Sequence, residues 1–214
     1  RTSRHNDHHG RRKTKATSNG PTTRTTSERE NPDTKPIYPL NKFSDPMELQ
    51  TYLTPMEKGH SMGLLSDAGC PGIADPGAVM VKRAHAKNYI VKPLVGPSSI
   101  LLAMMASGMN GQSFAFNGYL PIDKQERART IKRLEKHSGD YDQTQAFIET
   151  PYRNEQLLDD FTKNLSPNTQ LSIACDLTLP TEWVKTAPIN QWKNCKVDLH
   201  KRPAIFLFHK ELAI

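Results

Sequence analysis

Apolar positions recur along the chain with helical and strand spacings in turn, from Ile37 onward. In "SMGLLSD" and "YIVKPLV" they form short runs typical of buried strands, and elsewhere they recur every three or four residues, as on one face of a helix. The first series of predicted elements is a helix over 44–59, a strand from Ser61, a helix over 77–88, a strand from Tyr89 that Pro93 interrupts, and a helix with Ser98 or Ser99 as N-cap and Gly108 beyond its end.

A second series of elements follows "FAFNGYLPID". It comprises a charged helix over 123–137, a strand "QAFIET", a helix over 152–164, a strand from Gln170, a strand around Trp183, a short helix around Trp192 and a closing strand "AIFLFHK". Alternating strands and helices favour an α/β fold. We predict two small α/β lobes, residues 37–118 and 119–214, with mainly parallel or mixed sheets and a cleft between them.

The first 36 residues contain no Val, Ile, Leu, Met, Phe, Trp, Tyr or Cys. Such a segment cannot bury enough apolar surface to offset the entropy of ordering it, so we predict a disordered arm. The arm holds nine Lys and Arg against four Asp and Glu, and so carries five of the formal net charge of +7. It is interpreted as a solubilising or frame-altered segment, with a nucleic-acid-binding arm as the alternative. His5, His8 and His9 have no partners in it for a metal site.

The cysteines Cys70, Cys175 and Cys195 stand far apart, without a C-x-x-C spacing. They predict reduced thiols and a cytoplasmic protein. No apolar run approaches the ~20 residues that cross a bilayer, which predicts no membrane partner.

Two loops of small residues are candidate ligand sites, 66–77 and 96–100. Each is predicted to follow a strand and to precede a helix, where free backbone N–H groups can bind a phosphate, a carboxylate or a nucleotide. Consecutive parallel strands would bring both loops to one edge of a sheet, and so to one crevice. Neither loop is a G-x-G-x-x-G motif or a P-loop.

The succession of "SDAGCPGIADPGA", "PLVGPSSILLAMMASG", "FNGYLP" and "FIETPYRN" resembles the tetrapyrrole methylase family of S-adenosylmethionine-dependent methyltransferases. Within that family it is most similar to the branch of ribosomal small subunit methyltransferase I. The resemblance extends from Ile37 to the C-terminus. It implies a two-lobed homodimer that binds S-adenosylmethionine in the cleft and methylates RNA, at a ribose 2′-hydroxyl.

The resemblance also implies which residues contact the methyl donor. In the first loop these are Asp67, Gly69, Cys70, Pro71 and Ile73; in the second, Ser98, Ser99 and Ile100; in the second lobe, Ile148, Thr150, Ala174 and Ala204. For Ile148, Ala174 and Ala204, plain strand core is an equal alternative. The family opens with an apolar strand that residues 1–36 lack, so we expect a fragment or a frame-altered product, in which donor binding could be lost.

A hydroxyl acceptor benefits from a general base. "ETPYR" places Glu149, Tyr152 and Arg153 around one strand-to-helix turn, and we predict that they border the acceptor site, with Glu149 as the base. The alternatives are a cap or a partner of Arg153 for Glu149, and Asp67 as the base. The histidines show no metal-ligand spacing, and no G-x-S-x-G motif is present. Other readings are a tetrapyrrole or protein acceptor, or a non-catalytic relic of the fold.

Overall fold

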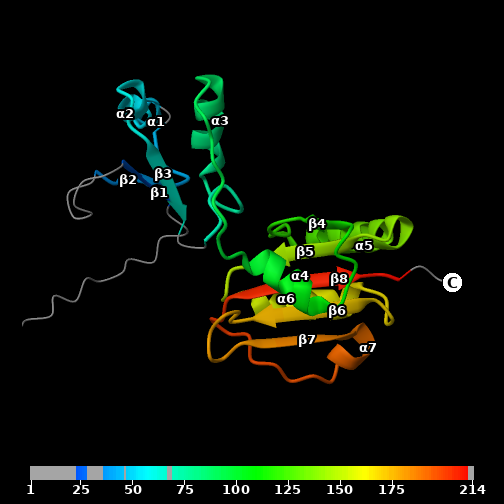
Figure 1. Cartoon of the computed structure of the whole chain (residues 1–214). Helices are drawn as coiled ribbons and strands as arrows, with labels where there is room; N and C mark the ends of the chain where they lie inside the picture. The colour runs from blue at the N-terminus through cyan, green and yellow to red at the C-terminus, as the bar shows by residue number, and fades with distance from the viewer. Residues whose placement is uncertain (1–22, 28–35, 46, 67–68, 212–214) are drawn as a thin grey trace, which may run out of the picture. The chain divides into compact units, whose positions relative to one another are not determined.

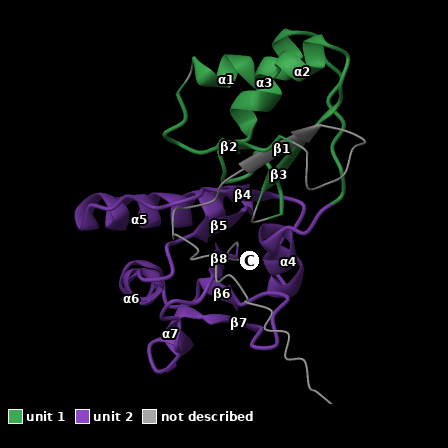
Figure 2. Cartoon of the chain, turned by 90° about the vertical axis from the view of Figure 1, so that its left-hand side faces the viewer, with its two compact units in different colours: residues 1–95 green, residues 96–214 purple. Residues whose placement is uncertain are grey.

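A computed structural model describes residues 23–27, 36–45, 47–66 and 69–211 of the chain. The chain divides into two compact units, residues 1–95 and 96–214, which Figure 2 shows in different colours. Each unit has its own sheet and its own hydrophobic core, and each is described separately.

The described part of unit 1 contains a three-stranded sheet and three helices (Figure 1). The strands are β1 (Thr23–Ser27), β2 (Tyr38–Leu40) and β3 (Met62–Ser66), in the order β2-β1-β3, with both pairs antiparallel. The helices are α1 (Glu48–Thr51), α2 (Thr54–Glu57) and α3 (Ala78–Ala86). The core of this unit consists of Leu40, Leu49, Tyr52, Leu53 and Met80.

Two predicted elements of unit 1 are corrected by the structure. The helix expected over 44–59 is divided into α1 and α2, because Pro55 lies at the start of α2 and has no N–H to continue the hydrogen-bond ladder of α1. The strand expected from Tyr89 is not formed. The side chains of Ile90 and Leu94 are 82% and 90% exposed, and no described strand pairs with this Pro93-containing segment.

The prediction of a wholly disordered arm over 1–36 is wrong for Thr23–Ser27, which forms β1. Backbone pairing with β3 at five positions, together with the strand preference of threonine, orders this stretch without apolar residues. The rest of the predicted arm lies outside the described residues, apart from Pro36.

Unit 2 contains a five-stranded mixed sheet of order β4-β5-β8-β6-β7. The strands are β4 (Phe114–Phe116), β5 (Thr144–Ile148), β6 (Gln170–Cys175), β7 (Trp183–Pro188) and β8 (Ala204–His209). Of the strand pairs described in this sheet, β4–β5 is parallel and the other three are antiparallel. The helices are α4 (Ser99–Ser107), α5 (Lys124–Tyr141), α6 (Asn154–Asn164) and α7 (Ile189–Trp192). The α/β class with a mixed sheet is thus confirmed.

The sheet of unit 2 is covered on both faces, with α4 on one side and α5, α6 and α7 on the other (Figure 2). The face toward α5 and α6 carries the larger core, in which Phe147, Phe161, Phe206 and Phe208 are fully buried. The α4 face carries a smaller cluster of apolar residues.

The division between the units falls at 95/96, whereas the sequence suggested a join near 118. The reason is that α4 packs against β6, β7 and β8, and that β4 pairs with β5. Both elements were assigned to the first lobe by their order along the chain, but their apolar contacts belong to the second.

Candidate functional site

The loop after β3 is held in shape by one carboxylate. Oδ1 of Asp75 accepts hydrogen bonds from the backbone N–H of Gly72 at 2.6 Å and of Gly77 at 2.7 Å. Gly72 has a φ of +85°, and a Cβ on Gly77 would lie 2.9 Å from the nitrogen of Gly72. The loop therefore requires glycine at both places and presents main chain rather than side chains.

Of the residues predicted to contact a donor in this loop, Gly69, Cys70 and Pro71 are half-buried, and Ile73 is 52% exposed. Asp67 lies outside the described residues. The second loop belongs to the other unit, so the expectation that both loops line one crevice stays a prediction.

We expect Asp75→Ala to increase hydrogen exchange at the amides of Gly72 and Gly77 by about tenfold, because both amides lose a charged acceptor. Exchange measured residue by residue tests this. Asp45→Ala is the control, since Asp45 accepts from a single amide, that of Met47, and should change exchange only there. Unchanged exchange at both glycines would show that the carboxylate does not hold the loop.

The second loop enters α4 as the sequence predicts. Ser98 is the N-cap, with an extended backbone and a hydroxyl that accepts from the N–H of Leu101 at 3.4 Å, and Gly108 ends the helix with a φ of +71°. Ser99 is exposed, whereas Ile100 packs against the cluster on the α4 face of the sheet.

One end of the unit 2 sheet brings several predicted donor contacts together. Ile205 pairs with Ile148 on β5 and with Ala174 on β6, and all three lie in the α4-side cluster together with Ile100. Ala174 and Ile205 are 1% and 5% exposed, so they are strand core, the alternative given from the sequence for Ala174. Ile100 and Ile148 are only partly buried and are the members of this cluster that a ligand could still contact.

Ala204 does not join this group. It pairs with Cys175 and faces the opposite side of the sheet, in the core beneath α6. Sequence analysis missed Ile205, which shares a face with Ala174; the alternation of "AIFLFHK" could have indicated it.

The predicted acceptor residues follow β5. Glu149 is 7% exposed and forms an ion pair with Arg153, with 3.3 Å between Oε2 and Nη2. Its Oε1 accepts from the N–H of Thr150 at 2.7 Å. Glu149 is thus a partner of Arg153, the alternative named from the sequence, and its role as a base stays a prediction. Thr150 and Tyr152 are exposed.

A second ion pair lies at the same end of the sheet and was not predicted. Asp176 follows β6 with a φ of +52°, a conformation that non-glycine residues rarely adopt. Its Oδ2 accepts from Oγ1 of Thr181 and from Nε of Arg202, each at 2.8 Å. These bonds, with that from Thr181 contributing most, hold the pKa of Asp176 below its ordinary value. Burial raises the pKa of the neighbouring thiol of Cys175.

We expect Asp176→Asn to destabilise the chain at neutral pH, with a loss that shrinks as the pH falls. The folded-state pKa of Asp176 is lowered from 3.8, so its stabilisation is fully present above that pH and is lost as the pH falls through the folded-state value. Urea unfolding of both proteins from pH 7 downward, followed by tryptophan fluorescence, measures the difference. A difference that is the same at every pH would contradict the assignment.

The described residues contain no group of three or more His, Cys, Asp or Glu side chains placed to hold a metal ion. No helix in the described part of the chain is long and apolar enough to cross a membrane. An open depression beside α6 is lined by Glu155, Leu158, Cys195, Lys196, Val197 and Asp198. None of the predicted site residues lines it.

Sequence comparison identifies the class of proteins to which this chain is similar: ribosomal RNA small subunit methyltransferases. The methyltransferase I of Buchnera aphidicola subsp. Schizaphis graminum is 32% identical over 154 residues, which are 72% of this chain and 53% of that protein. That of Escherichia coli O157:H7 is 28% identical over 155 residues, again 72% and 53% of the two chains. The resemblance stated from the motifs is thus confirmed, although the chain spans about half the length of these curated relatives.

No family model matches the chain. Among solved structures, a cobalt precorrin-4 methyltransferase matches with a TM-score of 0.48 and 16% identity, over 79% of this chain and 73% of that one.

Proposed function

We propose that this chain is an S-adenosylmethionine-dependent methyltransferase that acts on RNA, with a ribose 2′-hydroxyl as the acceptor. The observation that carries the proposal is the similarity to ribosomal RNA small subunit methyltransferase I over 72% of the chain. A homodimer and a cytoplasmic location belong to the same proposal.

The residues present fit the methyl donor at two places. The first loop presents main chain around Gly72 and Gly77, and the partly buried side chains of Ile100 and Ile148 are apolar, as contacts of an adenine ring usually are. We assign Gly69, Cys70, Pro71, Ile73, Ser98, Ser99 and Thr150 to the same role. When bound, S-adenosylmethionine supplies a methyl group on a sulfonium, already activated for displacement.

The contribution of the protein to such a transfer is positioning and the exclusion of water. We assign to Glu149 the removal of the proton from the acceptor hydroxyl, and to Arg153 the orientation of Glu149 through their ion pair. Tyr152, 72% exposed on the same turn, borders the acceptor.

Titration calorimetry of the full chain with S-adenosylmethionine tests the proposal. Binding with a micromolar Kd supports the enzyme. Absence of heat at millimolar donor would favour a non-catalytic relic. To distinguish RNA from a tetrapyrrole or protein acceptor, the chain is incubated with radiolabelled donor and each of the three acceptors in turn, and the label transferred to each is measured.

Ser99→Trp is expected to weaken donor binding at least about tenfold, because the indole would fill space beside the second loop, where we propose that the donor binds. Ala106→Trp is the matched control. Ala106 is an exposed residue near the other end of the same helix, so its replacement should leave the calorimetric Kd unchanged. Equal Kd values for both variants would remove Ser99 from the donor site.

A further inference from the structure

At one end of the unit 2 sheet, the turn before α6 and the turn before β8 lie side by side and are joined by hydrogen bonds. The N–H of Lys201 donates to the carbonyl of Pro151 at 3.1 Å. Nδ2 of the fully buried Asn154 donates to the carbonyls of Arg202 at 2.6 Å and of Leu199 at 3.3 Å. The turn that precedes α6 and the turn that precedes β8 therefore form one rigid surface, although they are about 50 residues apart in sequence.

This surface presents an exposed aromatic ring beside two basic side chains. The ring of Tyr152 is in edge contact with His200, with 6.1 Å between centroids, and Nζ of Lys201 lies 5.8 Å from the centroid of Tyr152. Lys201 has a φ of +59°, a left-handed conformation that the bond to Pro151 holds in place. Within the described part of the chain, Lys201 has no ion-pair partner, so its charge is available to a ligand.

Among the described side chains near the ring, two arginines are paired with carboxylates, whereas Lys201 and Asp198 have no ion-pair partner. Arg153 is paired with Glu149, and Arg202 with Asp176. Asp198 accepts from the backbone N–H of His200. An exposed aromatic ring beside the unpaired Lys201, on a backbone held by hydrogen bonds between the two turns, fits a ligand that has a planar ring next to an anionic group.

We propose that Tyr152, His200 and Lys201 form a stacking platform for an unpaired nucleobase of single-stranded RNA, with Lys201 on the adjoining phosphate. The proposal rests on the proposed function, because it names the part of the acceptor that this turn would hold. Stacking on an aromatic side chain needs a base whose face is free, so the platform selects single-stranded over duplex RNA.

The test measures binding of the full chain to a fluorescein-labelled single-stranded RNA of about 12 nucleotides, a length within the usual site sizes. Tyr152→Ala should weaken binding about tenfold, whereas Tyr152→Phe keeps the ring and should stay within about twofold. Lys201→Ala should lower the salt slope of log K by about 0.7, as expected for one lost phosphate contact on a single strand. A duplex of the same sequence should bind more weakly.

Tyr141→Ala is the matched control. Tyr141 is 67% exposed and lies 4.5 Å from the ring of His137, but no cation lies over its ring among the described contacts. It should bind RNA like the wild type. The tyrosine variants keep every charged residue of the chain, so unspecific electrostatic attraction is the same for each of them.

Equal losses for Tyr152→Ala and Tyr141→Ala, no loss for either, equal binding of the duplex, or no RNA binding by the wild type would each overturn the platform. Calorimetry with S-adenosylmethionine separates this from the proposed function. Donor binding without a Tyr152 effect removes the platform alone. A Tyr152 effect without donor binding leaves the platform standing and removes the methyltransferase.

Discussion

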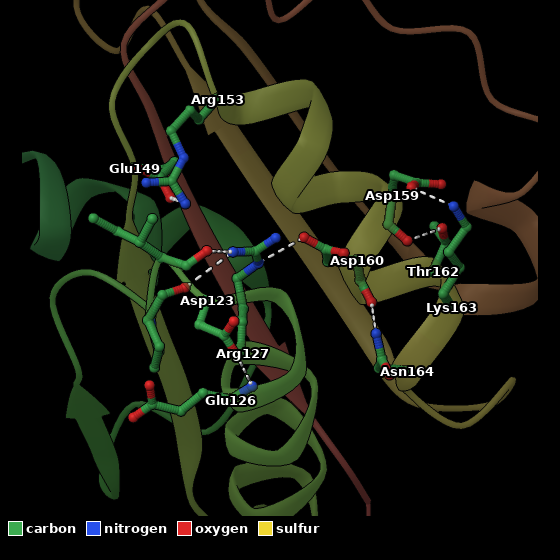
Figure 3. A network of polar contacts seen from close by, with 12 residues as sticks. Asp123, Glu126, Arg127, Glu149, Arg153, Asp159, Asp160, Thr162, Lys163 and Asn164 are labelled. Carbon is green, nitrogen blue, oxygen red and sulfur yellow. Dashed lines mark hydrogen bonds and ion pairs between the residues drawn. The ribbon is translucent and has the colours of Figure 1, made fainter.

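Asp160→Asn is expected to lower the free energy of unfolding of unit 2 by about 3–5 kcal/mol. Asp160 on α6 accepts from Nε of Arg127 on α5 at 2.7 Å, and the two side chains are 6% and 2% exposed (Figure 3). In the variant no negative charge compensates the buried guanidinium, whose other partners are the neutral carbonyls of Pro121 and Ile122. Urea unfolding followed by tryptophan fluorescence reports on this unit, because Trp183 and Trp192 both lie in it.

The neighbouring residue supplies the control. Asp159 pairs with Lys163 on the same helix, but both side chains are more than half exposed, so Asp159→Asn should change stability by less than about 1 kcal/mol. Replacing both members of the buried pair by apolar residues, Arg127→Met with Asp160→Leu, should recover most of the loss. Equal effects at Asp159 and Asp160 would show that the buried pair is not what joins α5 to α6.

The elements of unit 2 could be predicted because their signals are local. Ser98 and Gly108 delimit α4 through their own hydrogen bond and backbone conformation, and "AIFLFHK" is apolar at successive positions because β8 lies in the middle of the sheet. Such features depend on a few neighbouring residues, and the chain carries them in its sequence.

The predictions of secondary structure were wrong where the structure of a segment depends on another segment that is far away in the sequence. "YIVKPLV" has the composition of a strand, but no described strand pairs with it, and β1 forms from a polar stretch because β3 supplies the hydrogen bonds. The division at 95/96 likewise depends on which sheet α4 covers. Periodicity along one segment does not contain this information.

The candidate site was predictable in part for the same reason. Glu149 and Arg153 are four residues apart across the single turn between β5 and α6, so an ion pair between them could be expected from the sequence. The placement of Ile205 rather than Ala204 beside Ala174 depends on the register of β8 with two strands. The pairing of Asp176 with Arg202 depends on two segments 26 residues apart, which only the fold brings together.

Glu149→Gln is expected to lower the rate of methyl transfer to RNA by about 100-fold or more, with the affinity for S-adenosylmethionine unchanged. The amide cannot take the proton of the acceptor hydroxyl, yet its oxygen can still accept from the N–H of Thr150. Single-turnover transfer of a labelled methyl group measures the rate, and calorimetry measures the affinity. Turnover retained in the variant would reject the base.

Glu135→Gln is the control for burial. Glu135 is also 7% exposed and also accepts from a backbone N–H, that of Ser166, and from a threonine hydroxyl, that of Thr169. It lies at the opposite end of the sheet, because Thr169 precedes β6 whereas Glu149 follows β5, which runs in the same direction. Its replacement should lower stability while the turnover of folded protein stays within about threefold.

A last comparison separates proton transfer from the positioning of Arg153. If Glu149 acted only by holding Arg153, then Arg153→Gln would slow transfer as much as Glu149→Gln, and the double variant would be no slower than either, since residues that act as one unit are not additive. For a base, Glu149→Gln must be slower than Arg153→Gln, because the latter keeps the carboxylate and its bond from Thr150. The order of the two rates therefore shows whether Glu149 takes the proton of the acceptor hydroxyl or only positions Arg153.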